Sequence, residues 1–293
     1  MQLPLLVTLA MLAFAANSLL TRLALADGLI GALPFAAIRL LSGALALCIM
    51  VWLQRGAVPW RGKGRGIGVL SLTIYMVGFS VAYLAIDAGT GALILFGGVQ
   101  VTMFAGAVVA GQPIPLARWA GAALAFAGLC WLLWPQGGAA PSALHAGLML
   151  AAALGWGLYS LAGQRAGAPL PATAANFALA APVAVLLTLF MPAGLAQDTV
   201  GTRPAGIGLA VISGVVTSGL GYALWYLVLP RLAASVAALA QLSVPILAMA
   251  GGMVLLGEAL TIRFVIAAAL VLGGIAIGIL VPQRGNAGTG KAP

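Results

Sequence analysis

The chain has 293 residues, of which 63% are hydrophobic and only 6% are charged, and its formal net charge is +9. A water-soluble globular domain of this size would aggregate with such a composition, so the sequence is that of a protein whose solvent is the lipid bilayer. The Lys and Arg residues are scattered between apolar runs and form no basic patch, which argues against nucleic acid as a partner.

Long apolar runs separated by Gly, Pro and charged residues predict ten membrane-spanning helices. The run that begins at Leu3 has no charged segment before it and no clear cleavage site after it, so we expect a retained helix and not a signal peptide. The expected spans cover residues 3–25, 32–53, 66–86, 89–110, 115–134, 144–163, 171–191, 206–229, 232–255 and 262–281.

The two halves of the chain resemble each other. GIGVLS at Gly66 recurs as GIGLAV at Gly206, and the apolar run at Trp119 that ends in PQ recurs in character at Val265. A repeat of five spans reverses its orientation in the second copy, so the sequence predicts an inverted repeat with a central cavity at the interface of the halves. We expect repeats at 1–137 and 138–282, divided in the PQGGAAPS linker, and a disordered cytoplasmic tail at 283–293.

The distribution of Lys and Arg predicts the orientation. With both termini in the cytoplasm, nine of the thirteen basic residues flank spans on the inner side: Arg55, Arg61, Lys63, Arg65, Arg118, Arg165, Arg231, Arg284 and Lys291. All four acidic residues then fall on outer connections: Asp27, Asp87, Asp198 and Glu258. We therefore expect a multi-pass protein of the bacterial inner membrane with both ends inside.

The sequence lacks the common motifs of nucleotide binding, zinc-dependent hydrolysis and thiol redox chemistry. It contains no phosphate-binding loop, no HExxH and no CxxC, and its two cysteines, Cys48 and Cys130, lie in apolar runs. His145, the only histidine, lies at the start of span six, where a structural role is favoured. We therefore expect no enzyme activity, no metal and no cofactor.

Arg39 lies several residues inside span two, where an unpaired cation is costly in lipid. Two interpretations are open. The guanidinium faces protein or a water-filled cavity, or it snorkels to the outer surface from a helix that begins near Pro34.

Several aromatic and polar residues lie at membrane depth, where Tyr and Trp suit a cavity with apolar walls and hydrogen-bonding tips. Any one of them could instead serve only packing. Pro182, Pro245 and the pair Gly97-Gly98 can kink their helices, and Gly274 and Gly278 form a packing GxxxG pair. The residues expected to bind substrate are Asn17, Arg39, Tyr75, Phe79, Tyr83, Gln100, Trp156, Tyr159, Tyr222, Trp225, Gln241 and Ser243.

Three segments carry a family resemblance over roughly residues 5 to 282. ANSLLTRLAL at Ala16, AAIRLLSGALAL at Ala36 and QLSVPILAMAGGMVLLGEALT at Gln241, with a proline in span nine and Gly-Glu at its end, resemble the EamA-type ten-helix branch of the drug/metabolite transporter superfamily. Within that branch the chain is most similar to YddG-type aromatic amino-acid exporters. In the first half, GQPI at Gly111 has Gln112 where the family has an acid, so no symmetric role follows for Glu258.

The resemblance implies a pseudo-twofold bundle, a cavity lined mainly by spans one, three, four, six, eight and nine, and export of small metabolites. The function expected is alternating-access export of neutral amino acids with aromatic or other apolar side chains. Efflux of amphipathic drugs or other metabolites through the same cavity is the alternative, and a membrane-embedded enzyme lacks the necessary constellation. The expected partners are the small-molecule substrate and the lipid bilayer, and the oligomeric state stays open, a monomer included.

Overall fold

The computed structural model describes residues 3–26, 28–62, 64–86, 88–134, 142–190, 201–256 and 260–280. Within these residues every regular element is helical, and ten helical segments are long and apolar enough to cross a membrane. The predicted linker up to residue 141, the C-terminal tail and all four acidic residues lie outside the described part of the chain.

The observed helices agree with the predicted spans to within a few residues at most ends. Span three is the main exception, because its helix stops at Ala82 and tightens into short turn bonds such as Leu84 N–H to the Val81 carbonyl. The elements are α1 (Leu3–Ala26), α2 (Ala32–Leu53), α3 (Arg65–Ala82), α4 (Ala88–Val109), α5 (Leu116–Leu133), α6 (Ala143–Gly163), α7 (Pro169–Phe190), α9 (Pro204–Ile212), η1 (Ser213–Leu220), α10 (Gly221–Val228), η2 (Leu229–Arg231), α11 (Ala234–Gln241), α12 (Ser243–Leu256) and α13 (Ile262–Leu280).

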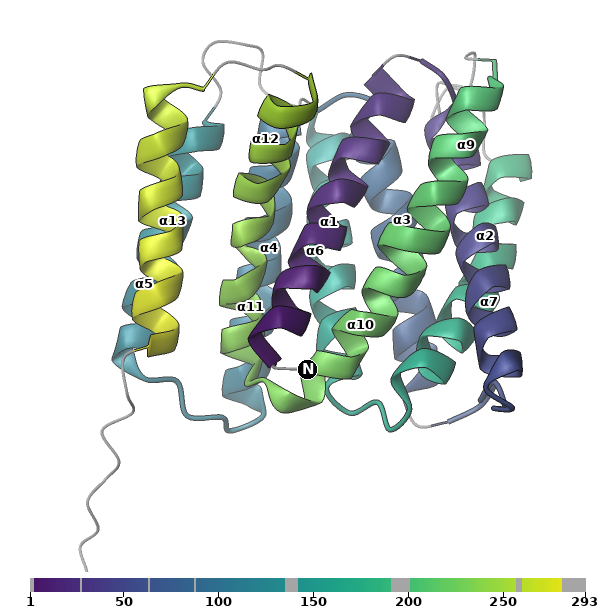
Figure 1. Ribbon diagram of the computed structural model, residues 1–293, viewed down its shortest axis with the longest axis horizontal. Helices are drawn as coiled ribbons and strands as arrows, with labels where there is room; N and C mark the ends of the chain where they lie inside the picture. The colour runs from purple at the N-terminus through teal and green to yellow at the C-terminus, as the bar shows by residue number, and fades with distance from the viewer. Residues whose placement is uncertain are drawn as a thin grey trace, which may run out of the picture.

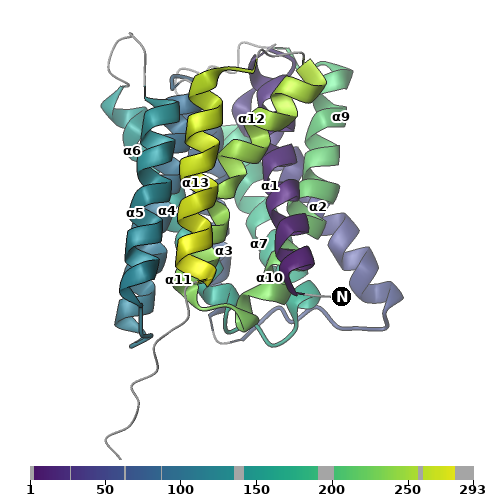
Figure 2. The same ribbon diagram turned by 60° about the vertical axis from the view of Figure 1, so that its left-hand side comes forward.

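The helices stand roughly side by side, with α5 and α13 grouped at one edge of the bundle (Figures 1 and 2). The largest helix contacts join α5 with α13, α3 with α6, α2 with α7, and α4 with α6. Helix α1 in turn packs on spans eight and nine. Exchanging each span for the one five places later converts this set of pairs into itself, which is the contact pattern expected of two repeats related by a twofold axis.

Small residues set how closely the helices approach. A Cβ atom at Gly274 would lie 2.5 Å from the Gly121 carbonyl oxygen, so α5 and α13 meet backbone to backbone at the predicted GxxxG pair. A Cβ atom at Gly43 of α2 would lie 2.7 Å from the Gly214 carbonyl oxygen of η1. Neither glycine position has room for a side chain, and the second contact lets span eight pack directly against α2.

Spans eight and nine are irregular at the centre of the bundle. Span eight contains a π-helical stretch, η1, which stacks residues five apart in sequence on one face. Span nine breaks at Leu242 between α11 and α12. Pro245 explains the break, since proline has no N–H to donate to the Gln241 carbonyl four residues earlier. The predicted kink therefore falls within three residues of Pro245.

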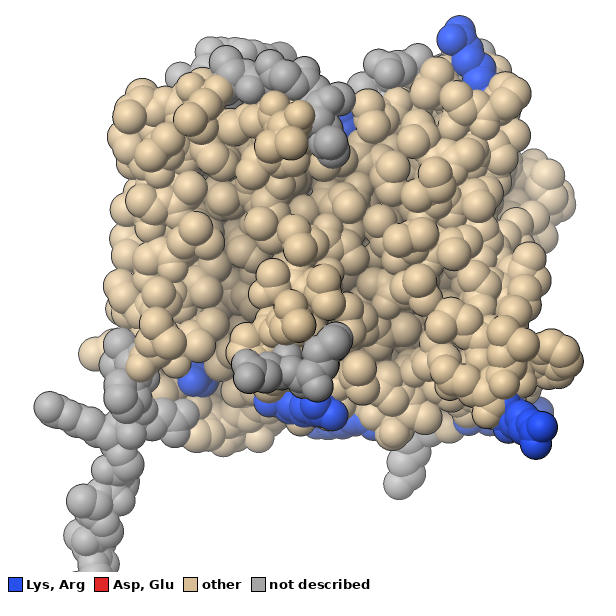
Figure 3. Space-filling view, in the orientation of Figure 1, with Lys and Arg blue, Asp and Glu red and all other residues tan. Residues whose placement is uncertain are grey.

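Basic residues gather at one end of the bundle. Figure 3 shows Lys and Arg mainly along its lower edge, the end at which α1 begins and α13 finishes (Figure 1). The ten spans found in the described residues return the chain to the side on which it started. This asymmetry is the one expected from the count of basic residues in the sequence.

Candidate functional site

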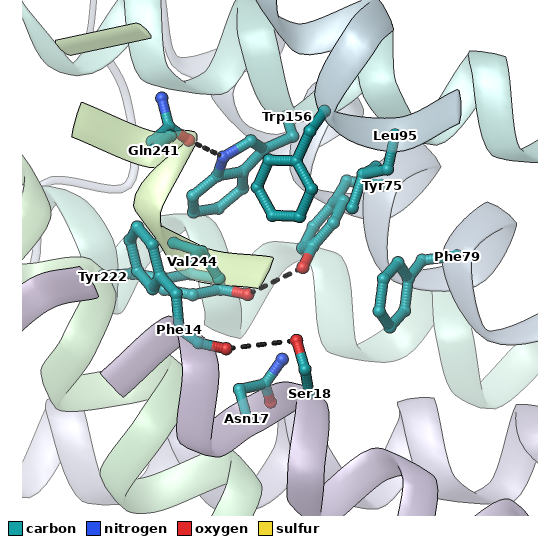
Figure 4. Close-up of a pocket in the computed structure, with 11 residues that line it drawn as sticks. Phe14, Asn17, Ser18, Tyr75, Phe79, Leu95, Trp156, Tyr222, Gln241 and Val244 are labelled. Atoms are coloured by element: carbon teal, nitrogen blue, oxygen red, sulfur yellow. Dashed lines mark hydrogen bonds between the residues drawn. The ribbon is translucent and has the colours of Figure 1, made fainter. Parts of the chain in front are cut away.

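A small cavity lies between the two halves near mid-depth. Its side chains come from spans one, three, four, six, eight and nine, and Figure 4 shows most of them. They are Phe14, Asn17 and Ser18 of α1, Tyr75 and Phe79 of α3, Leu95 and Phe96 of α4, Trp156 of α6, Tyr222 of α10, Gln241 of α11 and Val244 of α12.

Trp156 lies at the centre of a cage of aromatic rings. Its ring centroid lies 4.7 Å from that of Tyr222, 4.8 Å from Tyr75 and 5.2 Å from Phe14, the last in an edge-to-face arrangement. Such contacts fall in the range in which aromatic pairs attract each other beyond their apolar burial. The cage therefore offers ring faces and edges to a ligand that brings an aromatic or apolar group.

The break in span nine positions the polar partner of Trp156. Gln241 is the last residue of α11, and its Oε1 accepts a hydrogen bond from Trp156 Nε1. Its Nε2 donates to the Ala237 carbonyl at 3.3 Å and contacts the Met103 sulfur at 3.1 Å. These bonds hold the indole in place, so Trp156 contributes its ring to the cavity while its N–H is already engaged.

The π-helical stretch η1 positions Asn17. The hydroxyls of Ser213, Thr217 and Ser218 lie 2.7, 3.2 and 3.5 Å from Asn17 Oδ1. In a regular α-helix, residues five apart point about 140° away from each other, so Ser213 and Ser218 could not both face one oxygen. The wider turn brings them to the same side, and the Asn17 side chain is held from the back of the cavity.

Arg39 is fully buried, with 0% of its surface exposed, so the snorkelling interpretation is wrong. The close packing of α2 on η1 at Gly43 and Gly214 keeps the side chain inside the bundle. Its Nε donates to Ser218 Oγ at 2.6 Å, and its Nη2 donates to the Tyr222 hydroxyl at 2.6 Å. Arg39 thus contacts the cavity only through residues that line it or hold its lining.

Six of the twelve predicted site residues line the cavity: Asn17, Tyr75, Phe79, Trp156, Tyr222 and Gln241. The other six do not belong to its lining. Tyr159 stacks on Trp156 at 5.7 Å, and Tyr83 packs edge-to-face on Phe79 at 4.7 Å. Trp225 donates to Ser160 Oγ, and Gln100 donates to the Ala238 carbonyl. Ser243 donates to the Ala240 carbonyl and so caps the break in span nine.

Sequence reasoning missed five lining residues: Phe14, Ser18, Leu95, Phe96 and Val244. Helical spacing could have found the first two, because Phe14, Asn17 and Ser18 stand at the positions that share one helix face. Leu95 and Phe96 directly precede the Gly97-Gly98 pair, which also suggests a close approach in span four. Val244 follows the break in span nine and had no comparable signal.

A second polar group closes the bundle below the cavity. Arg65 of α3 donates to Asn176 Oδ1 of α7 at 2.6 Å and to the Ala172 carbonyl at 2.8 Å. Asn176 Nδ2 lies 3.4 Å from the Tyr226 hydroxyl, which donates to the Tyr159 carbonyl at 3.1 Å. Four helices, α3, α6, α7 and α10, are therefore joined on the side of the basic face.

Metal-binding side chains do not gather in the part of the chain that the structure describes. No group of three or more His, Cys, Asp or Glu residues there could hold an ion. The side chains available for binding at the cavity are aromatic rings, hydroxyls and amides, with the Arg39 guanidinium behind them. They suit reversible binding of a small molecule with a large apolar part and a few polar groups.

Comparison with known proteins agrees with this arrangement. Residues 144–280 match the EamA-like transporter family. The chain is 48% identical over 284 residues to an uncharacterized protein of Pseudomonas aeruginosa, covering 97% of this chain and 96% of the relative. One protein of known crystal structure shares the fold of this chain, with a TM-score of 0.79 and 23% sequence identity. The superposition covers 96% of this chain and 97% of the other. The ten-helix membrane fold, the family match and the near full-length relative together show that the chain belongs to the EamA-like transporter family.

Proposed function

We propose that the protein exports neutral amino acids, chiefly those with aromatic or other apolar side chains, by alternating access at the central cavity. The observation that carries the proposal is the composition of the cavity. Aromatic rings enclose most of it, and hydroxyl and amide groups gather at the edge formed by α1, α3 and α10. An amino acid with an apolar side chain has the same division into an apolar body and a polar end.

The ring cage accounts for the preference between side chains. Trp156, Tyr75, Phe79 and Phe14 can pack on a planar or branched apolar group, and a charged side chain would lose its hydration there without a counter-charge from the lining residues. Substrates such as phenylalanine, tyrosine or leucine therefore suit the cavity better than lysine or glutamate.

Accessibility supports an outward-facing conformation, whereas export as the direction of transport rests on the family resemblance. The lining residues Ser18 and Phe96 are half-buried, whereas Met103, Tyr159 and Tyr226, nearer the basic face, are buried. With the basic face in the cytoplasm, the cavity is closed on the cytoplasmic side by the Arg65–Asn176–Tyr226 hydrogen bonds. Loading from the cytoplasm would require these bonds to open, and release to the outside would occur from the conformation described here.

Counterflow into proteoliposomes tests the proposal. Purified protein is reconstituted, the vesicles are loaded with unlabelled substrate, and uptake of radiolabelled L-phenylalanine, L-leucine and L-lysine is compared with that of a panel of amphipathic drugs. We expect exchange of phenylalanine and leucine above that of protein-free vesicles, and none of lysine. Exchange of the drugs without exchange of any amino acid would contradict the proposal in favour of drug efflux.

Reporter fusions test the orientation. Fusions after residues 60 and 290 are expected to report a cytoplasmic location, and a fusion after residue 138 a periplasmic one, because the basic residues flank the first two positions. An external signal at residue 60 together with an internal signal at residue 138 would reverse the orientation and make the described conformation inward-facing.

A further inference from the structure

Arg39 poses a problem of charge balance. The guanidinium is completely buried, it has two hydrogen bonds, and its Nη1 has no hydrogen-bond partner in the described residues. The centroid of the Tyr222 ring lies 6.0 Å from Arg39 Cζ, at the limit of a cation–π contact. No described residue supplies a carboxylate, and a buried cation without one is costly to fold. The unfavourable free energy of burying this cation is explained if the substrate brings an anionic group to it.

The charge on Arg39 dictates the direction of the hydrogen bonds around it, because a guanidinium can only donate. Ser218 Oγ accepts from Arg39, so its own hydrogen points onward to Asn17 Oδ1, 3.5 Å away. The Tyr222 hydroxyl accepts from Arg39 as well, and its hydrogen points to the Tyr75 hydroxyl, 3.4 Å away. Two relays therefore start at one buried charge and end at two residues that line the cavity.

Both relays leave hydrogen-bond donors facing the cavity. With Oδ1 of Asn17 occupied by the η1 hydroxyls, Nδ2 is turned the other way and donates to no described residue; Figure 4 shows it on the side of the ring hydroxyls. The Tyr75 hydroxyl accepts from Tyr222 and donates to no described residue. The Tyr222 to Tyr75 distance is long for a pair of hydroxyls, so this hydrogen bond is weak and a ligand oxygen can replace the Tyr75 hydroxyl as the acceptor of the Tyr222 hydrogen.

We propose that Asn17, Tyr75 and Tyr222, polarised by Arg39, form a carboxylate-binding pole of the cavity. The protein then selects apolar monocarboxylates, amino acids included, by their carboxylate, and the ammonium group of an amino acid contributes little to recognition. This inference rests on the proposed function and deepens it by naming the group that is recognised. Charge-assisted donors that converge on one point suit a carboxylate oxygen. Arg39 is a positioning residue here, since it acts through Ser218 and Tyr222.

The ammonium group of an amino acid finds a weaker site. The described lining residues contain no acid, so an ammonium would meet only neutral acceptors such as the Ser18 hydroxyl, with Arg39 repelling it from behind. Removing the ammonium from phenylalanine gives 3-phenylpropanoate, and removing the carboxylate gives 2-phenylethylamine. The pole predicts that the first of these analogues binds and that the second binds much more weakly.

Isothermal titration of the purified protein with L-phenylalanine, 3-phenylpropanoate and 2-phenylethylamine, each alone, tests the pole. The variants are Arg39→Gln, Arg39→Lys and Tyr222→Phe, and the control is Arg118→Gln. Arg118 is also a buried arginine in a span, but it donates to Ser235 and the Gly278 carbonyl beside α13, away from the cavity. A defect common to buried arginines would appear in Arg118→Gln too.

We expect the wild type to bind 3-phenylpropanoate at least about 10-fold more tightly than 2-phenylethylamine, as hydrogen bonds to a charged group imply. Arg39→Gln should reduce this ratio to about 1, while Arg118→Gln keeps it. Arg39→Lys should lose most of the preference, because an ammonium lacks the fork that supplies both relays. Tyr222→Phe removes one relay and carries the test if Arg39→Gln does not fold.

The possible results distinguish a failure of the carboxylate-binding pole from a failure of the proposed function. Equal binding of the two analogues by the wild type, or an unchanged ratio in Arg39→Gln, would overturn the pole and leave amino-acid binding standing if L-phenylalanine binds. Binding of 3-phenylpropanoate without L-phenylalanine would keep the pole and contradict export of amino acids. Failure of all three ligands to bind the wild type would overturn both.

Discussion

The α5–α13 pair and the central cavity are made from helices of similar apolar composition, and they differ in what meets at the helix contact. At the edge of the bundle, Gly121 and Gly274 bring two backbones together, and Leu129, Ala267 and Val271 fill the remaining space. At the centre, large rings and buried polar groups hold the helices apart around a cavity. In a bilayer, small residues let helices approach closely, whereas the large rings at the centre of this bundle surround a space that a ligand can occupy.

The buried arginines of the two regions show the same contrast. Arg118 of α5 donates to the Gly278 carbonyl of α13 and to Ser235, so it joins the peripheral pair to its neighbour. Arg39 of α2 donates to two hydroxyls that lead toward the cavity. The first arginine joins helices at the edge of the bundle, and the second contacts a residue of the cavity lining, although both sit in apolar helices.

The largest expected effect is on substrate binding, from a substitution in the cavity. Trp156→Ala removes the central ring of the cage and the hydrogen bond to Gln241, and we expect a loss of about 2 kcal/mol of binding free energy, about a 30-fold rise in the apparent KM of transport. Kinetics of phenylalanine counterflow measure it.

Trp52 supplies the matched control for that variant. It lies near the end of α2 with 74% of its surface exposed, so Trp52→Ala should reach the membrane and transport normally. Near-normal rates for both variants would return Trp156 to ordinary packing and leave the cavity without its central element.

The second prediction concerns the packed pair. Gly274→Ala forces a methyl group against the Gly121 carbonyl and the Ala125 amide, and we expect it to lower the free energy of unfolding by about 1–3 kcal/mol. Gly273, its neighbour in α13, has open space at the Cβ position, so Gly273→Ala should change stability by less than about 1 kcal/mol.

Thermal unfolding in detergent and counterflow kinetics together decide the second prediction. Gly274→Ala should unfold at a lower temperature with an unchanged KM, because α13 contributes no residue to the cavity lining. A KM change as large as that of Trp156→Ala would show that the edge pair is coupled to the site and is not a passive contact.

The smallest expected effect is that of a pH gradient. The described lining residues include no Asp, Glu or His, so no group there can exchange a proton during transport. We expect phenylalanine flux at fixed substrate gradient and clamped voltage to be the same with and without an imposed pH gradient, as for a passive carrier or exchanger.

Accumulation that appears only with the pH gradient would contradict the third prediction. Asp87→Asn and Glu258→Gln, at two acidic positions outside the described residues, would then identify the proton-coupled group. Loss of accumulation in one of them, with exchange intact, would assign the coupling to that residue.

Much of the fold could be predicted from the sequence because a bilayer allows few solutions. A span must be a helix to satisfy its own backbone, so runs of about 20 apolar residues are enough to place ten helices. Hydropathy does not predict that α3 ends in short turns, since the end of a helix depends on local contacts. The π-helical turn of span eight was not predicted either, because SGVVTSGL has no local signal and the turn is stabilised by Asn17 from another helix.

The candidate site was predictable in its residue types and less so in its membership. Tyr159 and Tyr222 are both mid-span tyrosines, and nothing in their neighbours along the chain shows that Tyr222 lines the cavity while Tyr159 stacks behind Trp156. Phe14 looked like any apolar residue of span one. Which face of a helix meets the cavity depends on its partners, because spans without a charged face have no strong amphipathic signal.

The sequence by itself determined that this is a ten-span membrane protein with a basic end, a glycine contact in its last span and polar groups at membrane depth, because each of these follows from hydropathy, charge and residue size alone. Only the tertiary structure decided that Arg39 is buried and not at the surface, that η1 gathers three hydroxyls on Asn17, and that Gln241 accepts a hydrogen bond from Trp156. These outcomes depend on contacts between residues 85 to 201 positions apart, and only the packing of helices against one another selects such contacts.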